Sequence, residues 1–209
     1  MSSHTFVIGS KNPKKATEMQ NILADCGVNV VTVSDLRPDI QSPEETGTTF
    51  QENAALKALY FASATGYVCI ADDSGLEVDA LRNAPGVYSS RYAGVDGDDA
   101  ANNLKLLREM HGVPTEMRSA QFRTVVCLAV PGQVMLVAEG VVRGRILETP
   151  QGEGGFGYDP LFYYPEFDRS FGQIPAEQKA SVSHRGQALA KLKIDIPSFI
   201  NIFENRQNF

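Results

Sequence analysis

Two adjacent acids at the end of an apolar run are the first candidates for chemistry. Asp72 and Asp73 follow the β-prone run 67–71 and precede Ser74, so we expect them where a buried strand ends, which is where ligands collect in α/β sheets. Adjacent carboxylates repel each other unless a cation or strong donors lie close. Mg²⁺ prefers a few carboxylate oxygens together with waters and substrate phosphates. The pair indicates a magnesium site, and a tight turn with solvated aspartates is the alternative.

A second polar group lies where a strand passes into a helix. It comprises Ser10, Lys11, Asn12, Pro13, Lys14 and Lys15. A helix N-terminus offers free amides and the positive end of a dipole, and both suit a phosphate. Asn12 can cap this helix, and Pro13 suits its first position. The segment is not a Walker loop, because the terminal Lys-Ser/Thr is absent. It predicts either a phosphate site or a capped surface helix.

Further charged residues surround the next predicted helix. Glu44 and Glu45 lie in the loop before it and could supply a metal ligand. Asn53 and Lys57 are four residues apart and therefore share a face of the helix. Lys57 could reach a phosphate from there. Taken alone, each of these charges is more often a solvated surface residue.

Two later segments carry flat rings and donors. The glycine-rich run 152–157 lets the backbone approach a ligand closely, and Phe156 and Tyr158 could stack on a base. After Lys179 comes the segment 183–186, in which His184 and Arg185 could donate to a keto oxygen or a phosphate. A flexible loop and a helix cap are the plainer interpretations.

The elements that must position these residues follow from the hydrophobic pattern. Strands are predicted at 5–9, 28–33, 67–71, 119–130 and 133–147, the last two as a hairpin around Pro131-Gly132. Helices are predicted at 12–26, 49–66, 96–110, 175–180, 183–193 and from 197 onward. Strands mixed with helices and one long hairpin indicate an α/β fold with a mixed sheet.

Composition limits the classes of function. The chain has 209 residues, of which 43% are apolar, enough for one core or two lobes sharing a sheet, and we treat 1–209 as a single domain. The net charge of −6 argues against a broad basic face, so no nucleic-acid partner is expected. We see neither a signal peptide nor an apolar run of the ~20 residues that span a bilayer. The three cysteines show no metal-binding spacing, and we expect them buried and reduced in a cytoplasmic protein.

Six segments in this order resemble the inosine triphosphate pyrophosphatase family, over residues 6 to 192. The family pattern Ser-x-Asn-x-x-Lys-x-x-Glu is matched by Ser10, Asn12, Lys15 and Glu18. The remaining five matches are Glu44–Ala58, Asp72–Leu76, Pro85–Tyr92, Gly154–Phe162 and Ser183–Leu189. Each match is modest alone, but six in register make chance agreement very improbable.

The resemblance implies an elongated mixed sheet with flanking helices, two lobes with a central active-site cleft, and a homodimer. The implied reaction is Mg²⁺-dependent hydrolysis of ITP, dITP and XTP to the monophosphate and pyrophosphate. Asp73 and Lys15 would be catalytic, and Glu44 and Asp73 would bind the metal, with Asp72 in support. The substrate would be bound by Ser10, Lys11, Asn12, Pro13, Lys14, Lys15, Lys57, Ser74, Phe156, Gly157, Tyr158, Asp159, Lys179, His184 and Arg185.

In that assignment Phe156 stacks on the purine, while Arg185 donates to its 6-keto oxygen. The chain departs from the family pattern at Lys11 and Pro13-Lys14, where glycines are frequent, and at Gln151 and Gln173, where an arginine and a glutamate are common. Two other functions fit the same residues less well. They are a general nucleotide phosphatase that releases orthophosphate and a non-catalytic nucleotide-binding module.

Overall fold

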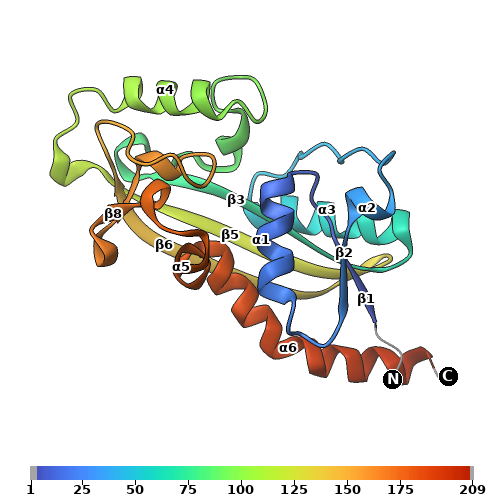
Figure 1. Cartoon of the computed structure of the whole chain (residues 1–209). Coiled ribbons are helices and arrows are strands. Elements are labelled where there is room, and N and C mark those ends of the chain that lie inside the picture. The colour runs from blue at the N-terminus through green and yellow to red at the C-terminus, as the bar shows by residue number, and fades with distance from the viewer. Residues whose placement is uncertain (1–3, 208–209) are drawn as a thin grey trace. The chain divides into compact units, whose positions relative to one another are not determined.

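The computed structural model describes residues 4–207, which divide into two compact units (Figure 1). Unit 1 contains residues up to 73, 125–140 and 185 onward, and unit 2 contains 74–124 and 141–184. Three strands contribute residues to both units: β3 (Val68–Val78), β5 (Ser119–Val130) and β6 (Gln133–Ile146). The chain therefore passes between the units several times.

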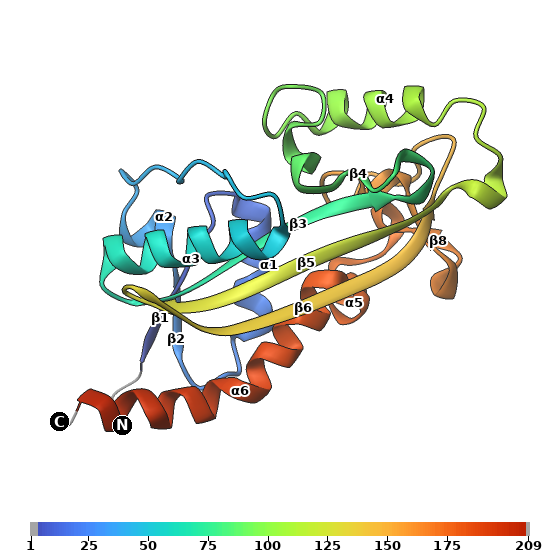
Figure 2. The same ribbon diagram turned by 180° about the vertical axis from the view of Figure 1, so that it is seen from behind.

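The sheet of unit 1 has the strand order β2-β1-β3-β5-β6 (Figure 2). Strand β1 (Thr5–Ile8) runs parallel to both β2 (Asn29–Thr32) and β3. The helices of this unit are α1 (Pro13–Leu23), α2 (Val33–Leu36), α3 (Phe50–Thr65) and most of α6 (His184–Gln207).

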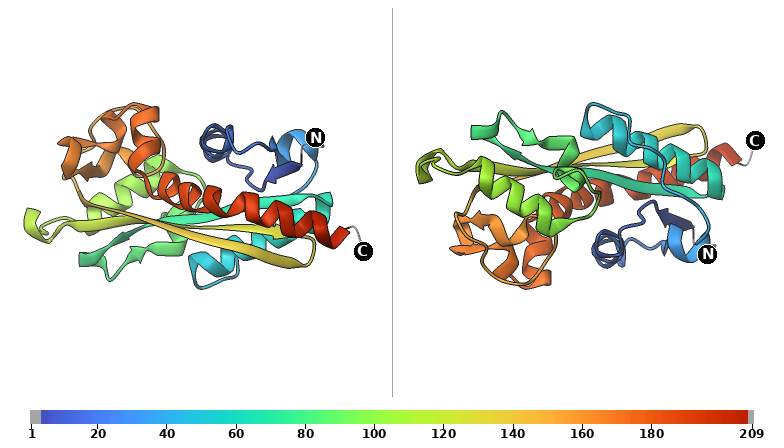
Figure 3. Two further views of the ribbon diagram at one scale, coloured as in Figure 1. Left: turned by 90° about the horizontal axis from the view of Figure 1, so that it is seen from below. Right: turned by 90° about the horizontal axis from the view of Figure 1, so that it is seen from above.

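Helices cover both faces of this sheet, α3 one face and α1 with α6 the other (Figure 3). On the α1 and α6 side, Ile70 packs in a buried cluster with Met19 and Leu189. The α3 side is packed so closely that a Cβ on Gly9 would lie 2.7 Å from the Phe61 ring and 2.8 Å from Cys69 Sγ. Only glycine fits at that position.

Unit 2 has the strand order β3-β5-β6-β7-β8, with β4 paired to β3. Its short strands are β4 (Ala84–Pro85), β7 (Phe162–Tyr164) and β8 (Arg169–Ser170), and its α-helices are α4 (Asp99–Glu109) and α5 (Ala176–Val182). Six 3₁₀ turns complete it: η1 (Asp79–Leu81), η2 (Gly86–Arg91), η3 (Thr115–Met117), η4 (Asp159–Leu161), η5 (Pro165–Phe167) and η6 (Phe171–Gln173). The rings of Phe122, Phe162 and Phe171 pack against one another in its core.

Much of the predicted secondary structure is confirmed, including the mixed α/β sheet and the hairpin of β5 and β6. Helix α1 begins at Pro13, and the Asn12 side chain caps it. Helix α3, predicted over 49–66, begins with a capping box of Thr49 and Glu52 and is capped at its C-terminus by Gly66, which adopts the left-handed conformation.

The prediction that a strand ends before Asp72 was wrong, because β3 continues to Val78. Two physical facts explain the extension. Leu76 and Val78 are buried, so the strand has a core to pack against beyond the acids. Both aspartates are paired with buried cations, which lowers the cost of placing them inside a sheet.

The prediction of separate helices at 183–193 and from 197 was also wrong, because α6 runs through Pro197. A proline removes one helical hydrogen bond. Ile196 and Phe199 are buried on either side of it, and this packing keeps the helix continuous. Helix α4 begins at Asp99 rather than near 96, because the Asp98 side chain caps it by accepting from the amide of Ala101.

Within residues 4–207 no helix is long and apolar enough to cross a membrane. Cys69 and Cys127 are buried and Cys26 is half-buried, and none of the three forms a disulfide in the part of the chain that the structure describes. Burial raises the pKa of the Cys127 thiol to about 11. The expectation of buried cysteines is met at Cys69 and Cys127.

Candidate active site

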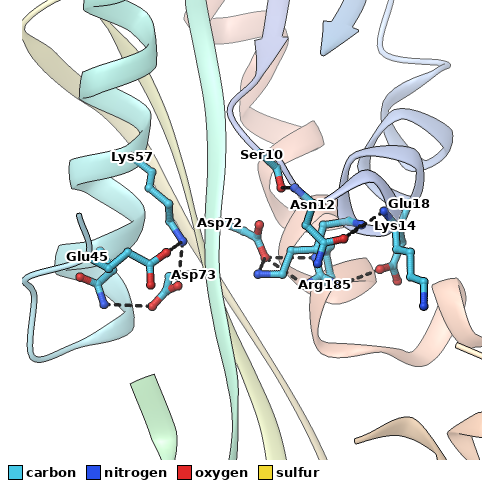
Figure 4. A network of polar contacts seen from close by, with 11 residues as sticks. Ser10, Asn12, Lys14, Glu18, Glu45, Lys57, Asp72, Asp73 and Arg185 are labelled. Atoms are coloured by element: carbon cyan, nitrogen blue, oxygen red, sulfur yellow. Dashed lines mark hydrogen bonds and ion pairs between the residues drawn. The ribbon is translucent and has the colours of Figure 1, made fainter. Parts of the chain in front are cut away.

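The two aspartates of β3 point to opposite faces of the sheet (Figure 4). Successive side chains of a strand alternate in direction. Asp72 therefore shares its face with Val68 and Ile70, which pack toward α1 and α6, while Asp73 faces α3. The sequence suggested a shared role at one ion, but the structure gives each acid its own set of partners.

Asp73 is held by two residues of α3. Lys57 Nζ lies 2.8 Å from Asp73 Oδ1, and Asn53 Nδ2 lies 3.3 Å from Asp73 Oδ2. The spacing of four residues brings both side chains to the same carboxylate, as their shared helix face predicted. Asn53 is fully buried, and its own oxygen accepts the amide of Gly47 at 2.8 Å. This side chain therefore connects the loop before α3 to Asp73.

Burial and the neighbouring charges together set the pKa of Asp73. Burial raises the pKa of this carboxyl above its ordinary value, although Lys57 and Lys15 oppose the shift. The pKa of Lys57 shows the converse balance, because burial opposes its charge but Asp73 and Glu45 outweigh burial and raise the pKa. The cluster consequently contains an ammonium ion beside a carboxylate whose proton affinity is above normal.

Asp72 is buried in a network that joins β3 to α1 and α6. Its Oδ2 accepts from Arg185 Nε at 3.1 Å and from Arg185 Nη2 at 3.0 Å, and it lies 3.5 Å from Lys15 Nζ. Arg185 Nη1 donates to Glu18 Oε2 at 2.6 Å. Arg185 is only 1% exposed, so it would have to give up a carboxylate to reach the base assigned to it by the family resemblance.

Two residues of this network have lowered pKa values, for different reasons. Burial would raise the pKa of Asp72, but Lys15 and Arg185 outweigh burial and hold it well below its usual range. Burial lowers the pKa of Lys15, and Asp72 only partly offsets that effect. Glu18 was not among the predicted site residues. The signal that could have found it is its place three residues after Lys15 on one face of α1.

The N-terminus of α1 is partly occupied by its own cap. Asn12 Oδ1 accepts from the amides of Lys14 at 3.0 Å and Lys15 at 3.2 Å, and Ser10 Oγ accepts from the Asn12 amide at 3.3 Å. The Lys14 side chain is exposed, whereas Lys15 faces Asp72. Lys11 Nζ donates to the carbonyl of Pro38 at 3.1 Å, which ties this loop to the segment after α2.

Of the two glutamates before α3, the structure brings Glu45 rather than Glu44 into the cluster. Glu45 Oε1 lies 2.6 Å from Lys57 Nζ, while Glu44 is exposed. Sequence alone could not choose between neighbours in a loop, where no periodicity assigns a direction. Across residues 4–207 no three histidine, cysteine or acidic side chains are grouped to hold a metal ion.

In unit 2 the glycine-rich loop forms an ordered cluster around Asp159. Asp159 Oδ2 accepts from the amide of Phe156 at 2.8 Å and from Lys179 Nζ at 2.5 Å. Lys179 Nζ also lies 4.6 Å from the centre of the Phe156 ring, within the range of a cation–π contact. Phe156, Asp159 and Lys179 were all predicted as base-binding residues, and the structure brings them together.

Three other predicted residues lie wholly or partly buried in unit 2. Tyr158 is buried, and its hydroxyl donates to the carbonyl of Ser89 at 2.9 Å. His184 is buried and stacks on Phe122 with ring centres 4.9 Å apart. Ser74 is half-buried within β3.

The two glutamines that depart from the family pattern also have structural partners. Gln173 Oε1 accepts from the amide of Ser170 at 3.0 Å in a capping box. The backbone carbonyl oxygen of Gln151 accepts from Ser170 Oγ at 2.5 Å. The ion pair of Lys179 with Asp159 exists without a glutamate at position 173.

Comparison with known proteins places the chain in a family. The sequence model of the Ham1 family matches residues 6–194, so the chain belongs to the Ham1 family. A protein of Desulforamulus reducens named dITP/XTP pyrophosphatase is 50% identical over 186 residues, which are 89% of this chain and 92% of that protein. A Listeria monocytogenes protein of the same name is 49% identical over 91% of this chain and 94% of its own length.

Solved structures of the family have the same fold. The Staphylococcus aureus Ham1 protein superposes with a TM-score of 0.81 at 42% identity, over 93% of this chain and 98% of that one. A HAM1 protein from Coxiella burnetii gives a TM-score of 0.83 at 39% identity, over 93% and 99%. These findings confirm the predicted family resemblance and the mixed α/β fold.

Proposed function

We propose that this chain hydrolyses the triphosphates of deaminated purines, namely ITP, dITP and XTP, to the monophosphate and pyrophosphate. One observation carries the proposal. Asp73 is a buried carboxylate with a raised pKa that lies 2.8 Å from a lysine ammonium, in a member of the Ham1 family whose relatives are named dITP/XTP pyrophosphatases. A base and a cation in contact suit attack of water on a phosphate anhydride.

In this mechanism Asp73 accepts the proton of the attacking water. The water oxygen forms a bond to the α-phosphorus, and the bond from that phosphorus to the bridging oxygen breaks, so pyrophosphate leaves. A raised pKa makes the Asp73 carboxylate a stronger base than an ordinary aspartate. Asn53 and Lys57 hold the carboxylate in place from two sides.

Lys57 and Lys15 supply the positive charge that the departing pyrophosphate needs. Catalysis of phosphoryl transfer is mainly positioning and charge stabilisation, and both lysines are held by aspartates of β3. Arg185 and Glu18 act one step further away, because they fix the carboxylate of Asp72 that orients Lys15. Lys14 is exposed and contributes less.

The acidic residues near Lys57 fit a magnesium ion. Asp73 and Glu45 both contact Lys57 and provide only carboxylate oxygens, and too few acids are grouped there to enclose an ion. This donor set suits Mg²⁺, which retains waters and binds substrate phosphates. We propose Asp73 as one ligand and keep Glu44, one residue before Glu45, as the second on the strength of the family resemblance alone; bound Mg²⁺ would neutralise charge on the triphosphate.

For the base we propose the cluster of Phe156, Asp159 and Lys179 in unit 2. Phe156 offers a ring for stacking, which is indifferent to the groups on the purine edge. Lys179 is a donor suited to the 6-keto oxygen that inosine and xanthosine carry and adenine lacks. A site that hydrogen-bonds such a group can reject the analogue without it by ~10⁴ or more.

A product assay over inosine, xanthosine, guanosine and adenosine triphosphates tests the function. We expect Mg²⁺-dependent release of pyrophosphate, fastest with the inosine and xanthosine nucleotides and lost on chelation with EDTA. Release of orthophosphate would instead indicate a general phosphatase. Binding without turnover would indicate a nucleotide-binding module. We further propose a cytoplasmic homodimer, as the family resemblance implies, and light scattering of the purified protein tests the dimer.

A further inference from the structure

Helix α4 holds the glycine-rich loop of unit 2 at one residue, Gly157. Asp99 Oδ2 accepts from the amide of Gly157 at 2.8 Å, and Asn103 Nδ2 donates to the carbonyl of Gly157 at 2.8 Å. Asp99 and Asn103 are four residues apart and share a face of the helix. Together they bind both polar groups of Gly157.

The clamp is itself rigid. Asn103 Nδ2 also donates to the carbonyl of Asp99 at 2.7 Å, which fixes its side chain against the helix. Asn102, one residue away and buried, ties α4 to the segment around η2 by accepting from the amide of Ala93 at 2.7 Å and donating to the carbonyl of Ser90 at 2.9 Å. The loop is therefore attached to a helix that cannot shift freely.

Gly157 needs such a clamp because of its conformation and its neighbour. Its φ angle is +61°, in the left-handed region that favours glycine. Glycine loses more conformational freedom than any other residue when its backbone is ordered. The preceding residue is Phe156, whose amide is bound by Asp159 and whose ring contacts Lys179. The Phe156 amide and both polar groups of Gly157 are thus bound by side chains.

We infer that Asp99 and Asn103 are positioning residues that make Phe156 a preformed platform for the purine. This inference rests on the proposed function of the loop. A ring that is already fixed when the base arrives loses little conformational freedom on binding. The clamp should accordingly set the affinity for the base, while the chemistry at the phosphates depends on Asp73 and the lysines of unit 1.

The test is the steady-state kinetics of Asn103→Ala and Asp99→Ala on ITP. We expect KM to rise roughly five- to tenfold for each, the effect of losing one hydrogen bond, with kcat changed less than about twofold. The double variant should be little worse than either single variant, because both side chains act on the same residue. Inhibition by pyrophosphate, which has no base, should be unchanged.

Two conservative variants separate positioning from a general loss of structure. Asp99→Asn keeps an acceptor for the Gly157 amide and should restore KM to near the wild-type value. Asn103→Asp has the same shape but presents a carboxylate to two carbonyl oxygens, so it should be at least as impaired as Asn103→Ala. Leu104→Ala, at a neighbouring position that is 58% exposed, is the matched control and should behave as wild type.

An unchanged KM in both alanine variants, with an active wild type, would overturn the inference. So would a fall in kcat accompanied by weaker inhibition by pyrophosphate, since that would mean a general disturbance. Failure of the proposed function has a different signature, because the wild-type protein itself would then release no pyrophosphate from any nucleotide.

Discussion

Asp73 combines a cost to the fold with a proposed role in the reaction. Because burial raises its pKa, the ionised carboxylate is less favourable in the folded chain than in the unfolded chain at neutral pH. An asparagine side chain at this position would be nearly isosteric and uncharged. We therefore expect Asp73→Asn to abolish turnover while its melting temperature stays at or above that of the wild type.

Pyrophosphate release and differential scanning calorimetry measure the two effects. Nucleotide binding by titration calorimetry is the control, since Lys57 and Lys15 remain. Retention of more than about a tenth of kcat, or less than about 1.4 kcal/mol of lost transition-state stabilisation, would contradict the role of base.

The ionised carboxylate of Asp72 has the opposite effect on the stability of the fold from that of Asp73. Its pKa is held below the usual range by Lys15 and Arg185 in spite of burial, so its ionised form stabilises the folded chain. That contribution is fully present above the unfolded pKa of about 4 and is lost as the pH falls toward the folded pKa. We expect the free energy of unfolding to decline steeply below pH ~4 in the wild type.

Urea unfolding at a series of pH values from neutral to acid measures this decline. The Asp72→Asn variant should be less stable at neutral pH and show a shallower loss in acid, because it has no proton to gain at this position. Parallel curves for the two proteins would mean that another carboxylate controls the acid response.

At the scale of single residues, the sequence predicted well which residue types occupy the candidate site. It predicted only in part which way their side chains point. The capping by Asn12 and the shared face of Asn53 and Lys57 follow from local rules, and both are found. The burial of Arg185 between Asp72 and Glu18 could not be predicted, because residues 113 and 167 positions apart meet only through the tertiary fold.

Among the elements, the close packing of α3 against the end of β1 fixes the start of the segment that we propose to bind phosphate. A methyl group at Gly9 would overlap the Phe61 ring and the Cys69 sulfur. We expect Gly9→Ala to lower stability by about 1–3 kcal/mol through overpacking, and to impair turnover because Ser10 and the start of α1 follow directly.

Chemical denaturation and the product assay measure both effects. Combining Gly9→Ala with Phe61→Leu should recover part of the lost stability, since the smaller side chain makes room. Gly27→Ala is the contrasting control, because a Cβ there meets no atom within 4 Å and only its positive φ is strained. Equal stability of Gly9→Ala and the wild type would show that the helix can move aside.

The predicted elements failed where tertiary packing overrides local signals. Acids after an apolar run normally end a strand, but β3 continues because cations lie on both of its faces. A proline normally ends a helix, but α6 continues because Ile196 and Phe199 remain in the core. The hydrophobic pattern of one segment does not show which charges or core side chains the tertiary fold places beside it.

For the whole molecule, the question is whether its two units unfold together. Each has its own buried cluster, one around Ile70 and one around Phe162, yet β3, β5 and β6 each supply residues to both. Unfolding one unit would break the hydrogen-bonded ladders that continue into the other. We therefore expect a single cooperative transition at a fixed protein concentration.

Circular dichroism and tyrosine fluorescence should give coincident unfolding curves, and the calorimetric enthalpy should equal the van't Hoff value. Ile70→Ala in unit 1 and Leu161→Ala in unit 2 should each shift the whole transition. A variant that splits the transition in two would show that the units are separate cooperative blocks.

Because side chains alternate along β3, the number of residues that precede each aspartate in the strand decides which face of the sheet it occupies. Asp72 and Asp73 are joined by one peptide bond, yet one has a depressed pKa and the other a raised one because they face different helices. A single residue inserted between Val68 and Asp72 would move Asp72 into the position that Asp73 now occupies opposite Lys57, and Ala71 into the position opposite Arg185. A single deletion would instead move Asp73 opposite Arg185 and Ser74 opposite Lys57. A change of length that a surface loop tolerates would therefore leave one of the two cations without its carboxylate.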